Sequence, residues 1–145
     1  VESDAPDLLD LELSLKDGNT LTVSSLFMGT IHTVLFVDNV EADWIETLGE
    51  EICNAPTFAE KKNVNFVKVL DDHTLQMITY ERGVGMTQAC GTGACASVVT
   101  AARKGLCSKT AEVILPLGSL KIEIKDDGHV MMEGPSVHVL EGKLY

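Results

Sequence analysis

The chain has 145 residues, about the size of one ordinary domain, and is long enough to bury a hydrophobic core. Its formal net charge of −11 speaks against a nucleic-acid partner, because binding a phosphate backbone needs clustered lysines and arginines. No apolar run approaches the roughly 20 residues that cross a bilayer and no signal-peptide pattern opens the chain, so we expect no membrane partner.

The first part of the chain is expected to form strands. Residues 9–16 alternate apolar and polar side chains, as a half-buried strand does. The turn signal at 17–19 then leads into a returning strand at 20–26. The mostly apolar residues 31–38 predict a further strand that is buried on both faces.

A helix is expected next. Asp38 or Asn39 can cap it, because short polar side chains accept hydrogen bonds from the first N–H groups of a helix. One stripe of this helix carries its apolar residues, which are Val40, Trp44, Ile45, Leu48 and Ile52. Residues 63–70 and 73–82 then predict two more strands.

The residues after Cys90 predict a second helix, at 91–106, that is rich in alanine, serine and valine. Gly105 stands where its C-terminal stop belongs. The helix carries almost no charge before Arg103, so we expect sheet to surround it.

Short strands are expected in the remainder, at 111–117, 119–124, 129–132 and 136–140, with a turn at 126–128. We see no linker, low-complexity stretch or internal repeat in the sequence. We therefore predict one α+β domain in which a mostly antiparallel sheet wraps around a central helix.

The segment Gln-Ala-Cys-Gly-Thr-Gly-Ala-Cys-Ala-Ser at 88–97 carries the strongest chemical signal. A helix N-terminus favours negative charge, which stabilises a thiolate at Cys90 and equally suits a bound carboxylate or phosphate. Gly91 and Gly93 are expected to let a ligand approach the backbone, and Thr92 offers a hydroxyl. A cysteine before a helix is usually structural, but the glycines make little sense for core packing and favour a functional thiol.

Glu81, Arg82 and Gly83 stand just upstream of this segment. They provide an acceptor for an ammonium group, a bidentate donor for a carboxylate and a flexible joint. By themselves, Glu81 and Arg82 would be an ordinary charge pair at a strand end. Together with the thiol and the helix N-terminus they suit a zwitterionic amino acid, which is the small-molecule partner we expect.

The other three cysteines are interpreted as structural. Cys95 lies inside the helix as a small buried residue, and no motif around Cys53 or Cys107 indicates a catalytic or binding role. No Cys-x-x-Cys motif or histidine pair accompanies them, so we expect no metal site. Four unevenly spaced cysteines are also too few for a disulfide scaffold, which favours a reducing cytoplasm.

Residues 80–97, Tyr-Glu-Arg-Gly-Val-Gly-Met-Thr-Gln-Ala-Cys-Gly-Thr-Gly-Ala-Cys-Ala-Ser, closely resemble the C-terminal catalytic motif of the diaminopimelate epimerases, the amino-acid racemases of lysine and cell-wall biosynthesis. Residues 27–41, 58–67 and 132–142 are similar to three further segments of that family. The resemblance implies epimerisation without pyridoxal phosphate or another cofactor. It also implies two similar α/β domains that face each other across a cleft.

Carried over residue by residue, the resemblance implies roles for seven positions. The implied catalytic residues are Cys90, Glu81 and His32, with Cys90 one of two catalytic cysteines and His32 near the reacting centre. The implied substrate-binding residues are Asn63, Glu81, Arg82, Gly91 and Thr92. Gly91 and Thr92 would hold the α-carboxylate of the substrate. Glu81 and Arg82 would bind its ionic groups, and Asn63 would contact its distal end.

Part of the sequence departs from the family pattern. The family's Asn-Pro before the histidine is Thr30-Ile31 here, which removes a polar side chain expected at the substrate. The acidic residue usual after the Gly-x-Gly is Met86, and the family's Phe-Pro-Glu-Arg has become Phe-Ala-Glu-Lys at 58–61. Diaminopimelate is therefore the leading substrate, with another amino acid of a related racemase as the alternative.

Inverting an α-carbon takes a base on one face, an acid on the other, and donors that neutralise the carboxylate. Cys95 cannot be the second group, because it shares a helix with Cys90 and the two thiols cannot flank a substrate. The chain also begins with Val1 rather than methionine. We therefore interpret residues 1–145 as the C-terminal catalytic half-domain of an epimerase, inactive without an N-terminal half that carries the second cysteine. That half is the expected protein partner, and a homodimer is left open.

Two interpretations from other classes also stay open. A redox or peroxide-sensing module would join Cys90 to Cys95, but their spacing along one helix is a poor geometry for a disulfide. The other interpretation is a non-enzymatic binding domain that kept the fold and lost the activity.

Overall fold

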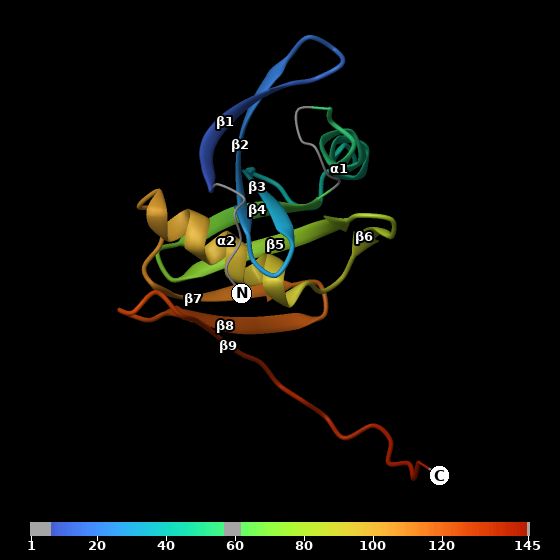
Figure 1. The fold of residues 1–145 in the computed structure, drawn as a ribbon, viewed down its shortest axis with the longest axis vertical. Helices are drawn as coiled ribbons and strands as arrows, with labels where there is room; N and C mark the ends of the chain where they lie inside the picture. The colour runs from blue at the N-terminus through green and yellow to red at the C-terminus, as the bar shows by residue number, and fades with distance from the viewer. Residues whose placement is uncertain (1–6, 57–61, 145) are drawn as a thin grey trace.

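The computed structural model describes residues 7–56 and 62–144. Within them the chain forms two helices and nine strands, and all the strands belong to one sheet (Figure 1). In chain order the elements are β1 (Leu8–Ser14), β2 (Thr20–Phe27), β3 (Ile31–Phe36), α1 (Ile45–Cys53), β4 (Asn63–Asp71), β5 (Thr74–Glu81), β6 (Gly85–Thr87), α2 (Gly91–Arg103), β7 (Thr110–Leu115), β8 (Gly118–Ile124) and β9 (Val130–Glu133).

The sheet is mostly antiparallel, and the predicted α+β class is confirmed. Its strands follow the order β1-β2-β3-β4-β5-β7-β8-β9, and β6 pairs with β5. Among the described strands, the β3–β4 and β5–β7 pairs are parallel. Each of these pairs is joined by a connection that contains a helix, because neighbouring parallel strands need a long crossover.

Helix α2 lies at the centre, and the sheet curves around it (Figure 1). Every residue from 93 to 101 is buried, which is possible because the side chains are small. The buried hydroxyls of Ser97 and Thr100 donate to the carbonyls of Gly93 and Ala96, at 2.7 and 2.8 Å, so they need no other partner. The helix ends as predicted, with Gly105 in the left-handed region at φ +72°.

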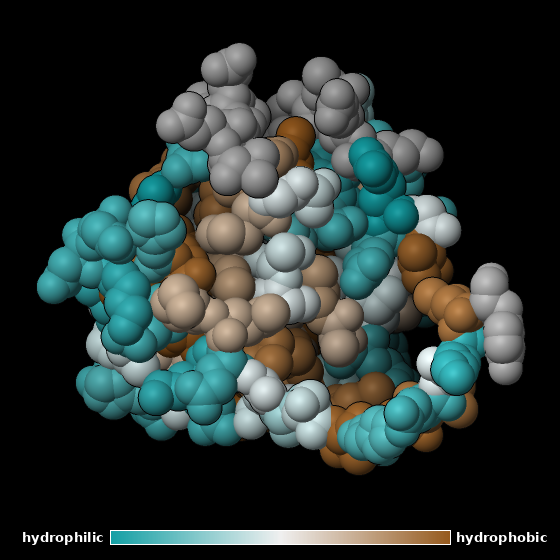
Figure 2. Space-filling view, turned by 60° about the horizontal axis from the view of Figure 1, so that its bottom comes forward, coloured by the Kyte–Doolittle hydropathy of each residue, from teal (hydrophilic) through white to brown (hydrophobic). Residues whose placement is uncertain are grey.

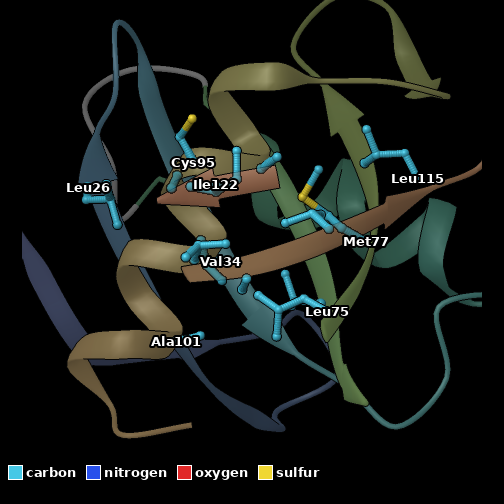
Figure 3. Close-up of a cluster of buried hydrophobic side chains, with 14 residues drawn as sticks. Leu26, Val34, Leu75, Met77, Cys95, Ala101, Leu115 and Ile122 are labelled. Carbon is cyan, nitrogen blue, oxygen red and sulfur yellow. The ribbon is translucent and has the colours of Figure 1, made fainter. Parts of the chain in front are cut away.

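The apolar side chains around α2 form the larger of two cores (Figure 3). Strands from both halves of the sheet contribute to it, including Leu26 and Val34 from one side and Val113 and Ile122 from the other. Helix and sheet therefore bury one continuous interior, and this packing holds the N-terminal end of α2 in a fixed position against the strands.

Helix α1 covers the opposite face of β4 and β5 and builds the second core. Successive residues of a strand point to opposite faces, so Val64 and Phe66 pack toward α1 while the residues between and beyond them face α2. The helix approaches the sheet closely at Gly49, where a Cβ atom would lie 2.7 Å from Cβ of Tyr80.

The predicted start of the first helix is wrong. The helix begins at Ile45, and its N-cap Trp44 makes no side-chain capping bond. Asn39 instead accepts a hydrogen bond from the backbone N–H of Glu41, at 2.9 Å, and closes a turn. Short polar side chains form such turns as readily as they cap helices. Val40, which was expected on the helix, is nevertheless buried in the core.

The predicted strand at 136–140 is also wrong. Residues 134–144 extend away from β9 without regular structure, as Figure 1 shows, and in Figure 2 they form an arm of brown and teal residues beside the main surface. Val137 and Val139 are 81% and 90% exposed. An alternating pattern becomes a strand only where a sheet edge accepts it, and no strand of the described residues lies beside this segment.

Neither helix in the part of the chain that the structure describes is long and apolar enough to cross a membrane.

Candidate active site

The predicted site residues converge where three central strands meet the start of α2. His32 pairs with Asn63 in the parallel β3–β4 ladder, and Val64 pairs with Tyr80 between β4 and β5. The first residues of β3 and β4 therefore lie beside the last residue of β5, Glu81. The sheet thus brings together residues that are 49 positions apart along the chain, from 32 to 81.

Cys90 is the N-cap residue of α2, as predicted. Its backbone is extended, with φ −145° and ψ 101°, and its carbonyl accepts the first helical hydrogen bond from Ala94 at 2.9 Å. The cysteine side chain makes no capping hydrogen bond. The N–H groups of the first helical residues, Gly91 to Gly93, precede the first intrahelical donor and so have no acceptor within the helix.

A row of polar side chains links the sheet to this helix end. Thr79 Oγ1 donates to Asn65 Oδ1 at 3.0 Å, and Asn65 Nδ2 donates to His32 Nδ1 at 3.1 Å. His32 Nε2 lies 3.0 Å from Thr92 Oγ1. Thr92 Oγ1 in turn lies 3.8 Å from Cys90 Sγ. Contacts therefore run without a break from β5 to the thiol.

His32 is fully buried, and this burial lowers its pKa from 6.5 to about 4. Water cannot reach the ring to solvate a positive charge, so the neutral imidazole is the form present near pH 7. The amide of Asn65 and the hydroxyl of Thr92, which hydrogen-bond with the ring, are both uncharged. Thr92 itself is exposed, so the buried row reaches the surface there.

Glu81, Arg82 and Asn63 meet at the end of β5. Thr87 Oγ1 donates to Glu81 Oε1 at 2.9 Å, which holds the carboxylate at the β5–β6 turn. The backbone N–H of Arg82 donates to Asn63 Oδ1 at 3.0 Å, so the amide nitrogen of Asn63 is the group directed to other partners. Gly83 has φ +78°, a conformation that side chains disfavour, which explains glycine at this position.

The surroundings of the two glycines give a packing reason for them in addition to the predicted one. A Cβ at Gly93 would overlap Asn65 Oδ1 and lie 3.1 Å from Cys90 Sγ, and one at Gly91 would lie 2.9 Å from Met132 Sδ. Protein side chains therefore fill the space that a Cβ would take at each glycine, and the predicted approach of a ligand to their backbone stays a prediction. Packing of the polar row against α2 is one reason for glycine at position 93.

The other cysteines differ from Cys90 in their surroundings. Cys95 and Cys53 are buried, and Cys53 Sγ donates to the carbonyl of Lys62 at 3.1 Å. Burial raises the pKa of Cys95 and of the half-buried Cys107. Cys90 is half-buried and stands at a helix start. The prediction that Cys95 is a small buried residue is confirmed.

The sequence did not single out Asn65, Thr79, Thr87 or Met132 as parts of the site. One signal was available for Asn65, since Asn63 and Asn65 recur at a spacing of two among the apolar residues that begin this strand, and such residues share a face. Thr79, Thr87 and Met132 can be recognised as parts of the site only from the residues they contact in the folded chain.

Two departures from the family pattern can also be placed. Met86 pairs with Tyr80 and packs into the core under α1, on the sheet face opposite the polar row. Its effect on a substrate beside α2 would be indirect. Thr30 lies just before β3, half-buried, next to the strand that carries His32. Residues 58–61, the third departure, lie outside the described residues. The roles assigned to all the site residues stay predictions.

Comparison with known proteins gives one consistent result. The family model described as Diaminopimelate epimerase matches residues 24–139. Similar relatives include the diaminopimelate epimerase of Acidiphilium cryptum, 40% identical over 138 residues, which are 95% of this chain and 49% of the relative. That of Ectopseudomonas mendocina is 43% identical over 129 residues, which are 88% of this chain and 47% of the relative. The chain spans about half the length of the curated relatives it matches.

Solved structures show the same fold at low sequence identity. A hydroxyproline epimerase from Agrobacterium vitis has a TM-score of 0.63 and 16% identity, covering 81% of this chain and 41% of that one. A probable proline racemase from Agrobacterium radiobacter has a TM-score of 0.62 and 13% identity, covering 81% of this chain and 42% of that one.

Proposed function

Because the chain belongs to the diaminopimelate epimerase family, we propose that it supplies one half of a two-cysteine site that epimerises LL-diaminopimelate to meso-diaminopimelate without a cofactor. In that role the protein would act in lysine and cell-wall biosynthesis in the cytoplasm. The observation that carries the proposal is the position of Cys90 at the start of α2. Its side chain does not cap the first N–H groups of the helix, which are therefore available to a substrate.

The arrangement suits removal of an α-proton. The N–H groups of Gly91 and Thr92 would bind the α-carboxylate and neutralise the charge that builds up as the proton leaves. Cys90 is then the base for one stereoisomer and, as a thiol, the acid for the other, since both directions pass through the same intermediate. Glu81 would bind the α-ammonium, and Arg82 and Asn63 the distal groups of the substrate.

A second base is needed on the opposite face of the α-carbon. Cys95 lies in the core behind Cys90 and is 7% exposed, so it cannot reach that face. We infer that the second cysteine belongs to an N-terminal half of the enzyme, since this chain spans only about half the length of its relatives. The chain alone is then expected to bind the amino acid weakly and not to invert it.

The experiment is hydrogen exchange at the α-carbon in deuterated water. The chain is assayed alone and as a fusion to the N-terminal half of the Acidiphilium relative, with gel filtration and circular dichroism to establish that the fusion is folded. Exchange and inversion of diaminopimelate by the fusion, and no inversion by the chain alone, would support the proposal. A folded fusion that exchanges a different amino acid and leaves diaminopimelate inert would favour the related-racemase alternative, for which Thr30 beside β3 is the motivating residue.

A further inference from the structure

The geometry points to Asn65 as a positioning residue that fixes the tautomer of His32 and so directs the hydroxyl hydrogen of Thr92 toward Cys90 Sγ. The catalytic meaning of this inference rests on the proposed function. Its first readouts, a histidine tautomer and a thiol reaction rate, need no substrate and can fail or succeed separately from it.

The orientation of the Asn65 amide is the first step. Its nitrogen faces the carbonyl oxygen of Thr33 at 3.3 Å, and a carbonyl can only accept. Its oxygen accepts from the hydroxyl of Thr79 at 3.0 Å. Exchanging the two amide atoms would set oxygen against oxygen at Thr33. The amide is therefore held with its nitrogen directed at His32.

The tautomer follows from that orientation. An amide nitrogen donates only, so His32 Nδ1, 3.1 Å away, must be the acceptor. A neutral imidazole carries one N–H, which is then on Nε2. Burial keeps the ring neutral by lowering its pKa to about 4. Near pH 7 the ring therefore carries only the proton on Nε2, and Nδ1 stays an acceptor.

The hydroxyl of Thr92 completes the sequence. It accepts from His32 Nε2 at 3.0 Å, which leaves its single hydrogen free to point elsewhere. Cys90 Sγ, at 3.8 Å, is the other partner that the structure places beside it. A donor at this position favours the thiolate over the thiol. With the opposite tautomer, the hydroxyl would donate to the ring and present only lone pairs to the sulfur.

The close packing of Asn65 shows how tightly this row is fixed. Its Oδ1 occupies the space that a side chain at Gly93 would need, directly under the first turn of α2. Asn65 is fully buried, and so are His32 and Thr79, within 1% exposure. Because exchanging the two amide atoms would set the amide oxygen against the Thr33 carbonyl, one hydrogen-bonding direction is favoured along the row.

The experiment compares buried hydroxyls inside and outside the row. In the 145-residue chain, Thr79→Val removes one of the two bonds that hold the amide of Asn65 beside His32, and Thr100→Val removes a hydroxyl of the same kind that donates only within α2. Long-range nitrogen NMR of the imidazole reports the tautomer of His32, and iodoacetamide labelling read by mass spectrometry reports the rate at Cys90.

We expect the Nε2–H tautomer in the unsubstituted chain. Thr79→Val should slow alkylation of Cys90 about twofold, and Asn65→Leu about fivefold, since a hydrogen bond to a charged group is lost. Thr79→Ser, which keeps the hydroxyl, should restore the rate, and Thr100→Val should leave it unchanged.

An Nδ1–H tautomer in the unsubstituted chain would overturn the inference. So would equal alkylation rates in Thr79→Val and Thr100→Val, even if Asn65→Leu failed to fold. In the active fusion, the same Thr79→Val change should lower kcat with little change in KM, whereas a failure of the fusion to act on diaminopimelate would leave the tautomer and alkylation results standing.

Discussion

The two faces of β4 and β5 are built from alternate residues of the same strands, yet they are organised differently. Toward α1, side chains such as Phe66 and Ile78 form a core in which size and shape determine the packing. Toward α2, the next residues along, Asn65 and Thr79, are fixed by the direction of their hydrogen bonds. Both faces contribute stability, because Val67 and Met77 of the same strands pack into the core around α2. Only the α2 face also orients the polar groups beside Cys90, so the polar row and the α1 core should respond separately to substitution.

The largest expected effect lies at the end of the polar face. Cys90→Ala in the active fusion should lower α-proton exchange about a thousandfold, because the general base is removed. Cys95→Ala, five positions on in the same helix but in the core, is the matched control and should keep most of the activity. Deuterium incorporation followed by NMR measures both, and comparable losses in the two variants would contradict the role of Cys90.

The second prediction tests the apolar face. Phe66→Ala should reduce the free energy of unfolding by about 3–5 kcal/mol, because Phe66 is fully buried under α1 and its loss leaves a cavity. The folded variant should nevertheless alkylate at Cys90 at the unsubstituted rate. Urea denaturation gives the stability and iodoacetamide gives the rate. A large change in rate would show that the two faces are coupled.

The third prediction concerns pH. The folded-state pKa of His32, about 4, lies below its ordinary value of 6.5, so the unfolded chain binds this proton more tightly. The stability contribution is complete above pH 6.5 and is lost as the pH falls toward 4, by about 3 kcal/mol in total. His32→Gln should remove this part of the pH dependence. Denaturation curves of both chains between pH 4 and 7 measure the difference, which would be absent if His32 were solvated.

The smallest expected effect is a difference among the thiols. Cys90 should react with iodoacetamide about tenfold faster than Cys107, because burial raises the pKa of Cys107 whereas Cys90 stands at a helix N-terminus. Cys53 and Cys95 should react more slowly still, since both are buried. Peptide mapping after short labelling gives the order, and earlier labelling of Cys53 would contradict the placement of the helix start.

The sequence predicted the central features of the fold because they depend on local signals. The run of small residues after Cys90 and the stop at Gly105 defined α2, period-two alternation defined the strand predicted at 9–16, and an apolar run defined the one at 31–38. It failed where a residue had two local uses, as Asn39 did, or where a strand pattern lacked a neighbouring edge, as at 136–140. The polar row was hidden for a different reason. The direction of a hydrogen bond at Asn65 depends on Thr33 and Thr79, which only the folded sheet brings beside it.

The shared space between Asn65 and Gly93 has an evolutionary consequence. The amide oxygen of one residue occupies the volume in which the other would carry its first side-chain carbon. The two positions cannot diverge separately, because a lineage that keeps asparagine at 65 is held to glycine at 93. A lineage that shortened residue 65 would relieve this overlap but would still place a side chain at 93 against Cys90 Sγ, and it would give up the fixed orientation of the histidine in the same step.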